Sequence, residues 1–167
     1  MHTYTTPKIV GPNDGKAGSL GSIGVRFMID TEETLHRQGI PESAGGPVAG
    51  GGFSLVEHPM PPRALAAPLH RHTREDEYSY VLEGRMGALL GDDVVYAQAG
   101  DLVHKPRNQW HTFWNAGDEP CRILEIIAPG GFEGFFRGLV DALASGEPER
   151  SADICQTYGL RFPGVID

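Results

Sequence analysis

The fold is decided by two stretches of sequence, HRHTREDEYSYVLEG at residues 70–84 and GDLVHKPRNQWHTFWN at residues 100–115. His70 and His72 are two residues apart, so on a β-strand both rings point to the same face. Glu77 follows five residues after His72, and His111 lies in the aromatic, β-prone part of the second stretch. Imidazoles and one carboxylate form a donor set that a divalent transition metal accepts. The two stretches therefore predict a metal site on neighbouring strands.

Short β-prone runs continue on both sides of these stretches. From residue 53 onward, apolar and aromatic residues occur in short runs separated by turn signals such as Gly91-Asp92-Asp93. The chain contains 23 glycines and 13 prolines, and most of them lie between these runs. About eight to ten strands at a spacing of ~10 residues are typical of a β-sandwich or barrel. We therefore expect an all-β barrel over residues 53–128.

The segments outside the barrel have different patterns. Residues 1–22 lack a strand pattern, whereas residues 23–29 predict a strand. Residues 38–52 are rich in glycine, and a long loop of this kind is interpreted as a candidate lid over a pocket. We expect residues 1–52, the N-terminal strand and glycine-rich loop, to form one domain with the barrel.

Residues 129–167 change from strand to helix periodicity. Apolar residues recur at the spacing of an amphipathic helix, at Phe132, Phe135, Phe136, Leu139, Val140 and Leu143. Gly146 ends this helix, and a second short helix is expected at residues 151–158. The apolar stripe is interpreted as the face that packs against the barrel. The C-terminal segment is therefore expected to be a helical extension within the same domain.

Composition excludes several classes of protein. The net charge of −8 repels phosphate backbones, so we expect no nucleic-acid partner. No apolar run approaches the ~20 residues of a membrane span, and the first residues contain no apolar core of a secretion signal. Cys121 and Cys155 are too few for a disulfide framework and are interpreted as reduced thiols. These features predict a cytoplasmic protein without a membrane partner.

The spacing of the two stretches resembles the cupin family, whose motifs are G-x5-H-x-H-x3,4-E-x6-G and G-x5-P-x-G-x2-H-x3-N. Eight residues match at the family's spacing: His70, His72, Glu77, Gly84, Gly100, Pro106, His111 and Asn115. Gly84 and Gly100 also have 15 residues between them. The chain departs from the motifs at two turn positions, Ala64 and Asn108, and asparagine tolerates positive φ better than most residues. The resemblance implies a double-stranded β-helix, or jelly-roll, barrel.

The resemblance also implies the metal ligands. These would be His70, His72, Glu77 and His111. They would hold one divalent ion of Fe, Ni, Co, Mn or Cu, with Zn as a further option. Glu77 is chosen over its acidic neighbours because it alone has six residues before Gly84. Its strand parity also groups it with Ser79 and Val81. Glu77 is expected to act both as a ligand and as a catalytic base.

The chain is similar to the bacterial quercetin-dioxygenase-like cupins, which implies an O₂-dependent dioxygenase acting on a flavonol-like or enolisable aromatic substrate. Two alternatives remain open because one fold supports several functions. One is a non-redox metal-dependent cyclase or isomerase acting on a polyketide or sugar. The other is a small-molecule-binding cupin without turnover. The resemblance further implies a homodimer. The predicted substrate pocket consists of Phe53, Leu55, Tyr96 and Phe113.

Overall fold

The computed structural model describes residues 9–31 and 51–164. The candidate lid at residues 38–52 lies outside the described residues except for its last two positions. Among the described helices, none has the length and apolar character needed to cross a membrane.

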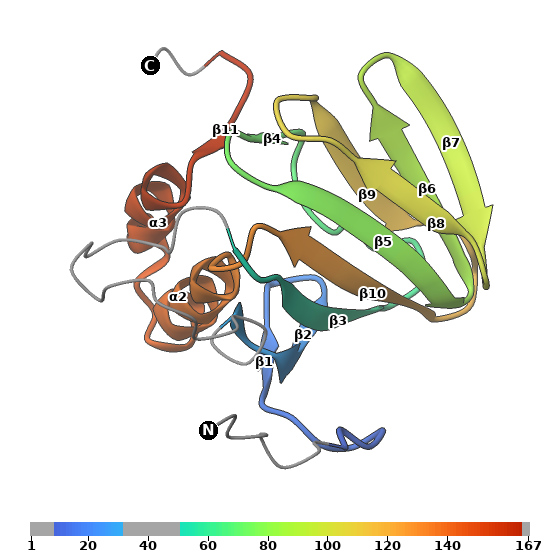
Figure 1. Ribbon diagram of the computed structural model, residues 1–167, viewed down its shortest axis with the longest axis horizontal. Coiled ribbons are helices and arrows are strands. Elements are labelled where there is room, and N and C mark those ends of the chain that lie inside the picture. The colour runs from blue at the N-terminus through green and yellow to red at the C-terminus, as the bar shows by residue number, and fades with distance from the viewer. Residues whose placement is uncertain (1–8, 32–50, 165–167) are drawn as a thin grey trace, which may run out of the picture.

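β-Strands are the main secondary structure of the described chain (Figure 1). The strands are β1 (Ala17–Ser19), β2 (Gly24–Ile29), β3 (Ser54–Met60), β4 (Arg71–His72), β5 (Asp76–Glu83), β6 (Arg85–Leu90), β7 (Asp93–Gln98), β8 (Leu102–Lys105), β9 (His111–Asn115), β10 (Cys121–Ala128) and β11 (Leu160–Arg161). The helices are α2 (Glu133–Ala144), the short 3₁₀ helix η1 (Pro148–Arg150) and α3 (Ser151–Thr157). The all-β class with a C-terminal helical segment is thus confirmed.

The strands form two larger antiparallel sheets and one two-stranded pair. The first sheet has the order β1-β2-β3-β10-β5-β8, the second has the order β7-β6-β9, and β4 pairs with β11. Burial alternates along β10, as expected for a strand with one face in the core. A core cluster joins the sheets, with Met60 and Val81 from the first sheet packed against Met86 and Phe113 from the second.

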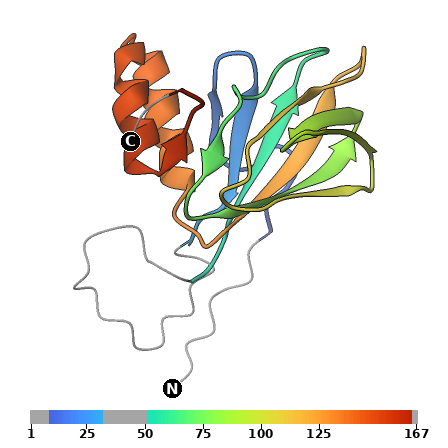
Figure 2. The ribbon, with the colours of Figure 1, turned by 90° about the horizontal axis from the view of Figure 1, so that it is seen from above.

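A second core cluster attaches the C-terminal segment to the first sheet. Phe27 and Val56 of this sheet pack with Phe132, Phe135 and Phe136 at the start of α2. Figure 2 shows α2 and α3 together beside the blue strands β1 and β2. The apolar side of α2 thus packs against the first sheet.

The structure differs from the sequence expectation at the N-terminus and agrees with it at a turn. Residues 17–19, expected to be irregular, form β1 and pair with β2. Strand β1 is only three residues long, too short for an alternating pattern to be visible in the sequence.

Asn108 has φ of 66°, so it occupies the positive-φ turn that the motif assigns to glycine. Arg63, beside the other departure at Ala64, has φ of 60°.

Candidate metal centre

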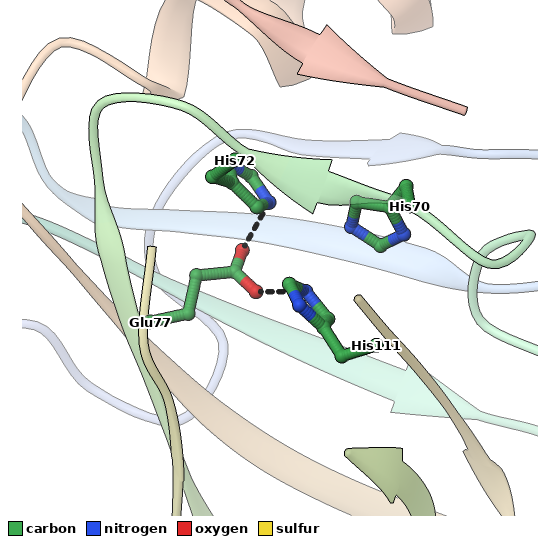
Figure 3. Close-up of side chains that lie close together, drawn as sticks. All are labelled: His70, His72, Glu77 and His111. Atoms are coloured by element: carbon green, nitrogen blue, oxygen red, sulfur yellow. Dashed lines mark hydrogen bonds and ion pairs between the residues drawn. The ribbon is translucent and has the colours of Figure 1, made fainter. Parts of the chain in front are cut away.

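The four predicted ligands lie together in the interior of the protein (Figure 3). His70 and His72 are at β4, Glu77 is in β5, and His111 begins β9. All four are buried, and one ligand atom from each lies within 4.8 Å of the others. The backbones of His70 and His111 exchange two hydrogen bonds, of 2.9 and 2.8 Å. This bridge joins the two sequence motifs and places their histidines side by side.

Two of the imidazoles are oriented by backbone carbonyl groups. Nδ1 of His70 lies 2.7 Å from the Pro68 oxygen, and Nδ1 of His111 lies 3.1 Å from the Gln109 oxygen. A carbonyl oxygen only accepts, so each Nδ1 carries the hydrogen and each neutral ring keeps a lone pair on Nε2. These lone pairs are what a metal ion requires of histidine.

His72 is oriented by a carboxylate instead. Its Nδ1 lies 3.5 Å from Oε2 of Glu75, and its Nε2 lies 3.3 Å from Oε1 of Glu77. Neither ring nitrogen has a hydrogen-bond partner of good geometry within the described part of the chain. Glu75 lies behind the ring and Glu77 in front of it, so Glu77 is the carboxylate that faces the cluster. Glu75 resembles the carboxylate that often supports a metal-bound histidine.

These donors fit a divalent cation. In His111, Nε2 lies 3.2 Å from Oε2 of Glu77. A neutral imidazole that donates through Nδ1 offers only a lone pair there, and a carboxylate oxygen cannot satisfy a lone pair. A cation among the four side chains would satisfy the lone pairs on both the His111 nitrogen and the Glu77 oxygen. The buried cluster is therefore a candidate metal site.

The charges of the cluster favour the protonation state of a metal ligand at Glu77 and His70, but not at His72. Burial alone raises the pKa of Glu77, but the positive charges of Lys105 and His72 hold it well below its usual range. Burial, together with the other two histidines, lowers the pKa of His70 to about 3. The two carboxylates beside His72 outweigh its burial and raise its pKa to about 9. A metal ion must therefore compete with a proton at His72. The low pKa of Glu77 suits a ligand but makes it a weak base.

A buried lysine connects Glu77 to a second carboxylate. Nζ of Lys105 lies 2.9 Å from Oε2 of Glu77 and 2.7 Å from Oε1 of Glu125, and it is fully buried. Ser79 also donates to Oε1 of Glu125, at 2.9 Å. Sequence reasoning missed Lys105 and Glu125. Lys105 is two residues from the apolar Val103, a spacing that places both on the same face of a strand and so indicates an inward lysine. Only the pairing of β5 with β8 places Lys105 opposite Glu77.

The cluster opens into a cavity of about 320 Å³. His70, His72 and Glu77 line its polar side, and they are joined there by His58 and Glu125. Five phenylalanines, together with aliphatic side chains, line most of the rest, namely Phe113, Phe132, Phe135, Phe136 and Phe162. The ligand set therefore faces a space in which a small aromatic molecule fits.

The predicted pocket residues divide into one inside this cavity and three outside it. Phe113 lines the cavity. Tyr96 is 57% exposed on β7 and packs edge-on against Trp114, and Phe53 is exposed. Leu55 alternates with buried neighbours on β3 and so lies on the opposite face from His58. The remaining aromatic lining comes from the C-terminal segment. Sequence analysis assigned this segment to packing alone, because a helical stripe does not distinguish core packing from cavity lining.

Comparisons with known proteins agree with this architecture. Residues 57–127 match the family model of the cupin domain. Over 97 residues the chain is 30% identical to quercetin 2,3-dioxygenase of Bacillus subtilis. This matched region covers 58% of this chain and 27% of that protein. The chain thus spans only about a quarter of the length of this curated relative.

Two solved structures share the fold. The polyketide cyclase RemF of Streptomyces resistomycificus is 26% identical with a TM-score of 0.55, over 73% of this chain and 79% of that one. KdgF from Halomonas sp. is 15% identical with a TM-score of 0.60, over 77% of this chain and 99% of that one. The family match, the paired motifs and the shared barrel lead to one conclusion: residues 57–127 of the chain form a cupin domain.

Proposed function

We propose that the protein is a metal-dependent dioxygenase that cleaves a flavonol-like or other enolisable aromatic substrate with O₂. The observation that carries this proposal is the buried set of three histidines and one glutamate at the polar side of an aromatic cavity. Four protein ligands leave one or two positions of a five- or six-coordinate ion for other molecules. The similarity to quercetin 2,3-dioxygenase, over 58% of this chain, supports the same chemistry.

The residues of the chain have distinct roles in this proposal. A redox-capable ion held by His70, His72, Glu77 and His111 would supply Lewis-acid and electron-transfer chemistry. Lys105 holds Glu77 in the charged form that a ligand requires. The same ammonium makes Glu77 a weak proton acceptor, so the site suits substrates whose hydroxyl proton is already acidic, as in an enol.

The aromatic side of the cavity positions the ring of the substrate. Phe113 approaches from the barrel, and Phe132, Phe135 and Phe136 approach from the C-terminal segment. Flat apolar side chains of this kind stack on an aromatic substrate and displace water. Exclusion of water protects reactive species from hydrolysis.

Elemental analysis followed by oxygen uptake tests the proposal. We expect near-stoichiometric Fe, Ni, Co, Mn or Cu in the purified protein, and its loss in a His70→Ala/His111→Ala variant. His104→Ala is the matched control, because His104 is an exposed histidine outside the cluster. Oxygen consumption with a flavonol should occur in the His104→Ala control and disappear in Glu77→Gln. Absence of uptake across a broad polyphenol panel in the metal-loaded protein would overturn the dioxygenase proposal.

A non-redox cyclase is the second candidate. The observation that favours it is the similarity to the polyketide cyclase RemF, which extends over most of both chains. In such an enzyme an ion held by the same four ligands would supply Lewis-acid chemistry, and no O₂ would be consumed. Product formation under nitrogen, with zinc as the bound metal, would support the cyclase. Tight binding of a ligand without any product would instead support a cupin that binds without turnover.

The setting of the protein is also a proposal. We infer a homodimer in the cytoplasm, as the family resemblance and composition suggest. Light scattering of the purified chain tests the first part, and a monomeric mass would overturn it. Cell fractionation tests the second.

A further inference from the structure

Two buried polar side chains face the cavity without belonging to the metal cluster. His58 on β3 and Glu125 on β10 both line the cavity, with exposures of 2% and 1%. In the pairing of these strands, Ile123 lies opposite His58 and Glu125 lies opposite Val56. His58 and Glu125 are therefore diagonal neighbours on the inner face of the sheet.

Glu125 has one satisfied oxygen and one without a partner. Its Oε1 accepts hydrogen bonds from Lys105 and Ser79, at 2.7 and 2.9 Å. Its Oε2 is buried and has no hydrogen-bond partner among residues 9–31 and 51–164. A buried carboxylate oxygen in this state is costly and calls for a donor. Lys105 already pairs with the other oxygen of Glu125, so a neutral hydroxyl group can supply the missing donor.

His58 presents a second acceptor. Its Nδ1 lies 2.9 Å from the carbonyl oxygen of Gly24, so Nδ1 carries the hydrogen and Nε2 carries the lone pair. Burial lowers the pKa of His58 despite the nearby charge of Glu125, which keeps the ring neutral. An edge-on contact with Phe136, at 5.1 Å between ring centroids, helps to orient the ring. A neutral ring in this tautomer accepts a hydrogen bond from a hydroxyl group.

We propose that His58 and Glu125 form a hydroxyl-recognition site, and that the substrate is a hydroxylated aromatic compound. Such a compound would place one oxygen at the metal cluster and donate a second hydroxyl group to these acceptors. The inference rests on the proposed function of the metal cluster. One cavity of about 320 Å³ contains both sites, and it lies at the small end of ligand pockets, so one compact molecule reaches both. Lys105, which bonds Glu77 and Glu125, fixes their separation.

Binding titrations under nitrogen test this inference without turnover. The probes are 3-hydroxyflavone, its derivatives with one additional hydroxyl group on either outer ring, and the corresponding methoxy ethers. We expect the metal-loaded protein to bind at least one hydroxylated derivative about tenfold more tightly than both the parent and the ether. The ether keeps the oxygen but removes the donated hydrogen, so this comparison isolates the hydrogen bond without a mutation.

Two variants assign the preference to the proposed residues. In Glu125→Gln an amide donor replaces the unpartnered oxygen, so the preference for hydroxyl over methoxy should disappear or reverse. In His58→Asn the amide nitrogen can still donate to Gly24, while the Nε2 acceptor is lost, so the preference should weaken. Glu83→Gln is the matched control, because Glu83 is exposed and lies outside the cavity lining. Metal content and thermal melting of each variant show whether it is folded.

The outcomes separate this inference from the proposed function. If 3-hydroxyflavone binds but added hydroxyl groups bring no preference, the recognition site is wrong and the proposed function stands. A preference that persists in both folded variants also overturns the site. If none of the flavones binds the metal-loaded protein, the flavonol-type function fails, and this inference fails with it.

Discussion

The two walls of the cavity are built from different kinds of side chain. The barrel wall carries buried titratable groups, namely His58, His70, His72, Glu77 and Glu125, with Lys105 behind them, beside apolar residues such as Phe113. The C-terminal wall, from α2 to the residue after β11, is aromatic and aliphatic. Members of the barrel wall bond to one another, so removing one leaves a buried charge. Members of the C-terminal wall contribute mainly packing, and their loss is more local.

The largest effect that we predict concerns Lys105 in the barrel wall. Replacement by methionine would leave Glu77 and Glu125 buried without the ammonium that bonds both. We expect Lys105→Met to lower the free energy of unfolding by about 3–5 kcal/mol, measured by urea denaturation. Adding Glu125→Leu should recover part of this loss, because one uncompensated carboxylate is then removed. Simple additivity of the two substitutions would contradict the view that the barrel wall acts as a unit.

A second prediction concerns Glu75, which supports the ring of His72. Glu75→Gln keeps the size of the side chain but removes the charge 3.5 Å from Nδ1 of His72. We expect metal affinity to fall by about tenfold, as for other side chains that orient metal ligands. Competition with a chelator measures this change, and Glu83→Gln on the exposed part of β5 is the control. Equal affinities in the two variants would show that Glu75 does not support the ligand.

The matching prediction for the C-terminal wall is smaller. Phe132 packs edge-on against His72, at 4.5 Å between ring centroids, and also contacts Phe135 and Phe136. Phe132→Leu keeps most of the apolar volume, so we expect a loss of about 1 kcal/mol in the free energy of unfolding and no loss of bound metal. A loss as large as that of Lys105→Met would remove the distinction between the walls.

The barrel wall was also easier to predict from sequence than the C-terminal wall. The metal cluster could be proposed because strand parity places His70 and His72 on one face, and the resemblance to the cupin motifs implies Glu77 and His111 as the other ligands. The hydrogen bonds between His70 and His111 then bring the two motifs together. Lys105 was missed because its position opposite Glu77 depends on strand register, which local sequence does not specify.

The pocket residues illustrate the same limit. Tyr96 was proposed for the pocket although it lies on the outer face, and Phe132 was assigned to packing although it also lines the cavity. Leu160 of β11 pairs with His72, a contact between residues far apart in the chain. Parity along one strand is local information. The position of a helix or a late strand relative to the barrel depends on tertiary packing.

The smallest predicted effect concerns Asp76, on the outer face next to Glu77. Its carboxylate accepts hydrogen bonds from Nη2 of Arg107 at 2.7 Å and from the Arg107 backbone N–H at 2.8 Å. The hydrogen bond from the Arg107 side chain is the main reason that the pKa of Asp76 falls from 3.8 to about 2. Because the folded-state pKa is lowered, the stabilisation is complete above about pH 4 and is lost as the pH falls through about 2.

Asp76→Asn removes this pH-dependent contribution. At neutral pH we expect a loss below about 1 kcal/mol in the free energy of unfolding, since solvent screens a partly exposed ion pair. The difference between the two proteins should shrink as the pH falls from about 4, and denaturation at several pH values measures it. A difference that stays constant down to about pH 2 would exclude the ion pair as its cause. Asp76 and Glu77 are neighbours of the same charge, but the ion pair of Asp76 is partly exposed and that of Glu77 with Lys105 is buried. A small loss of stability in Asp76→Asn and a large loss in Lys105→Met would therefore identify burial as the reason that the barrel wall acts as a unit.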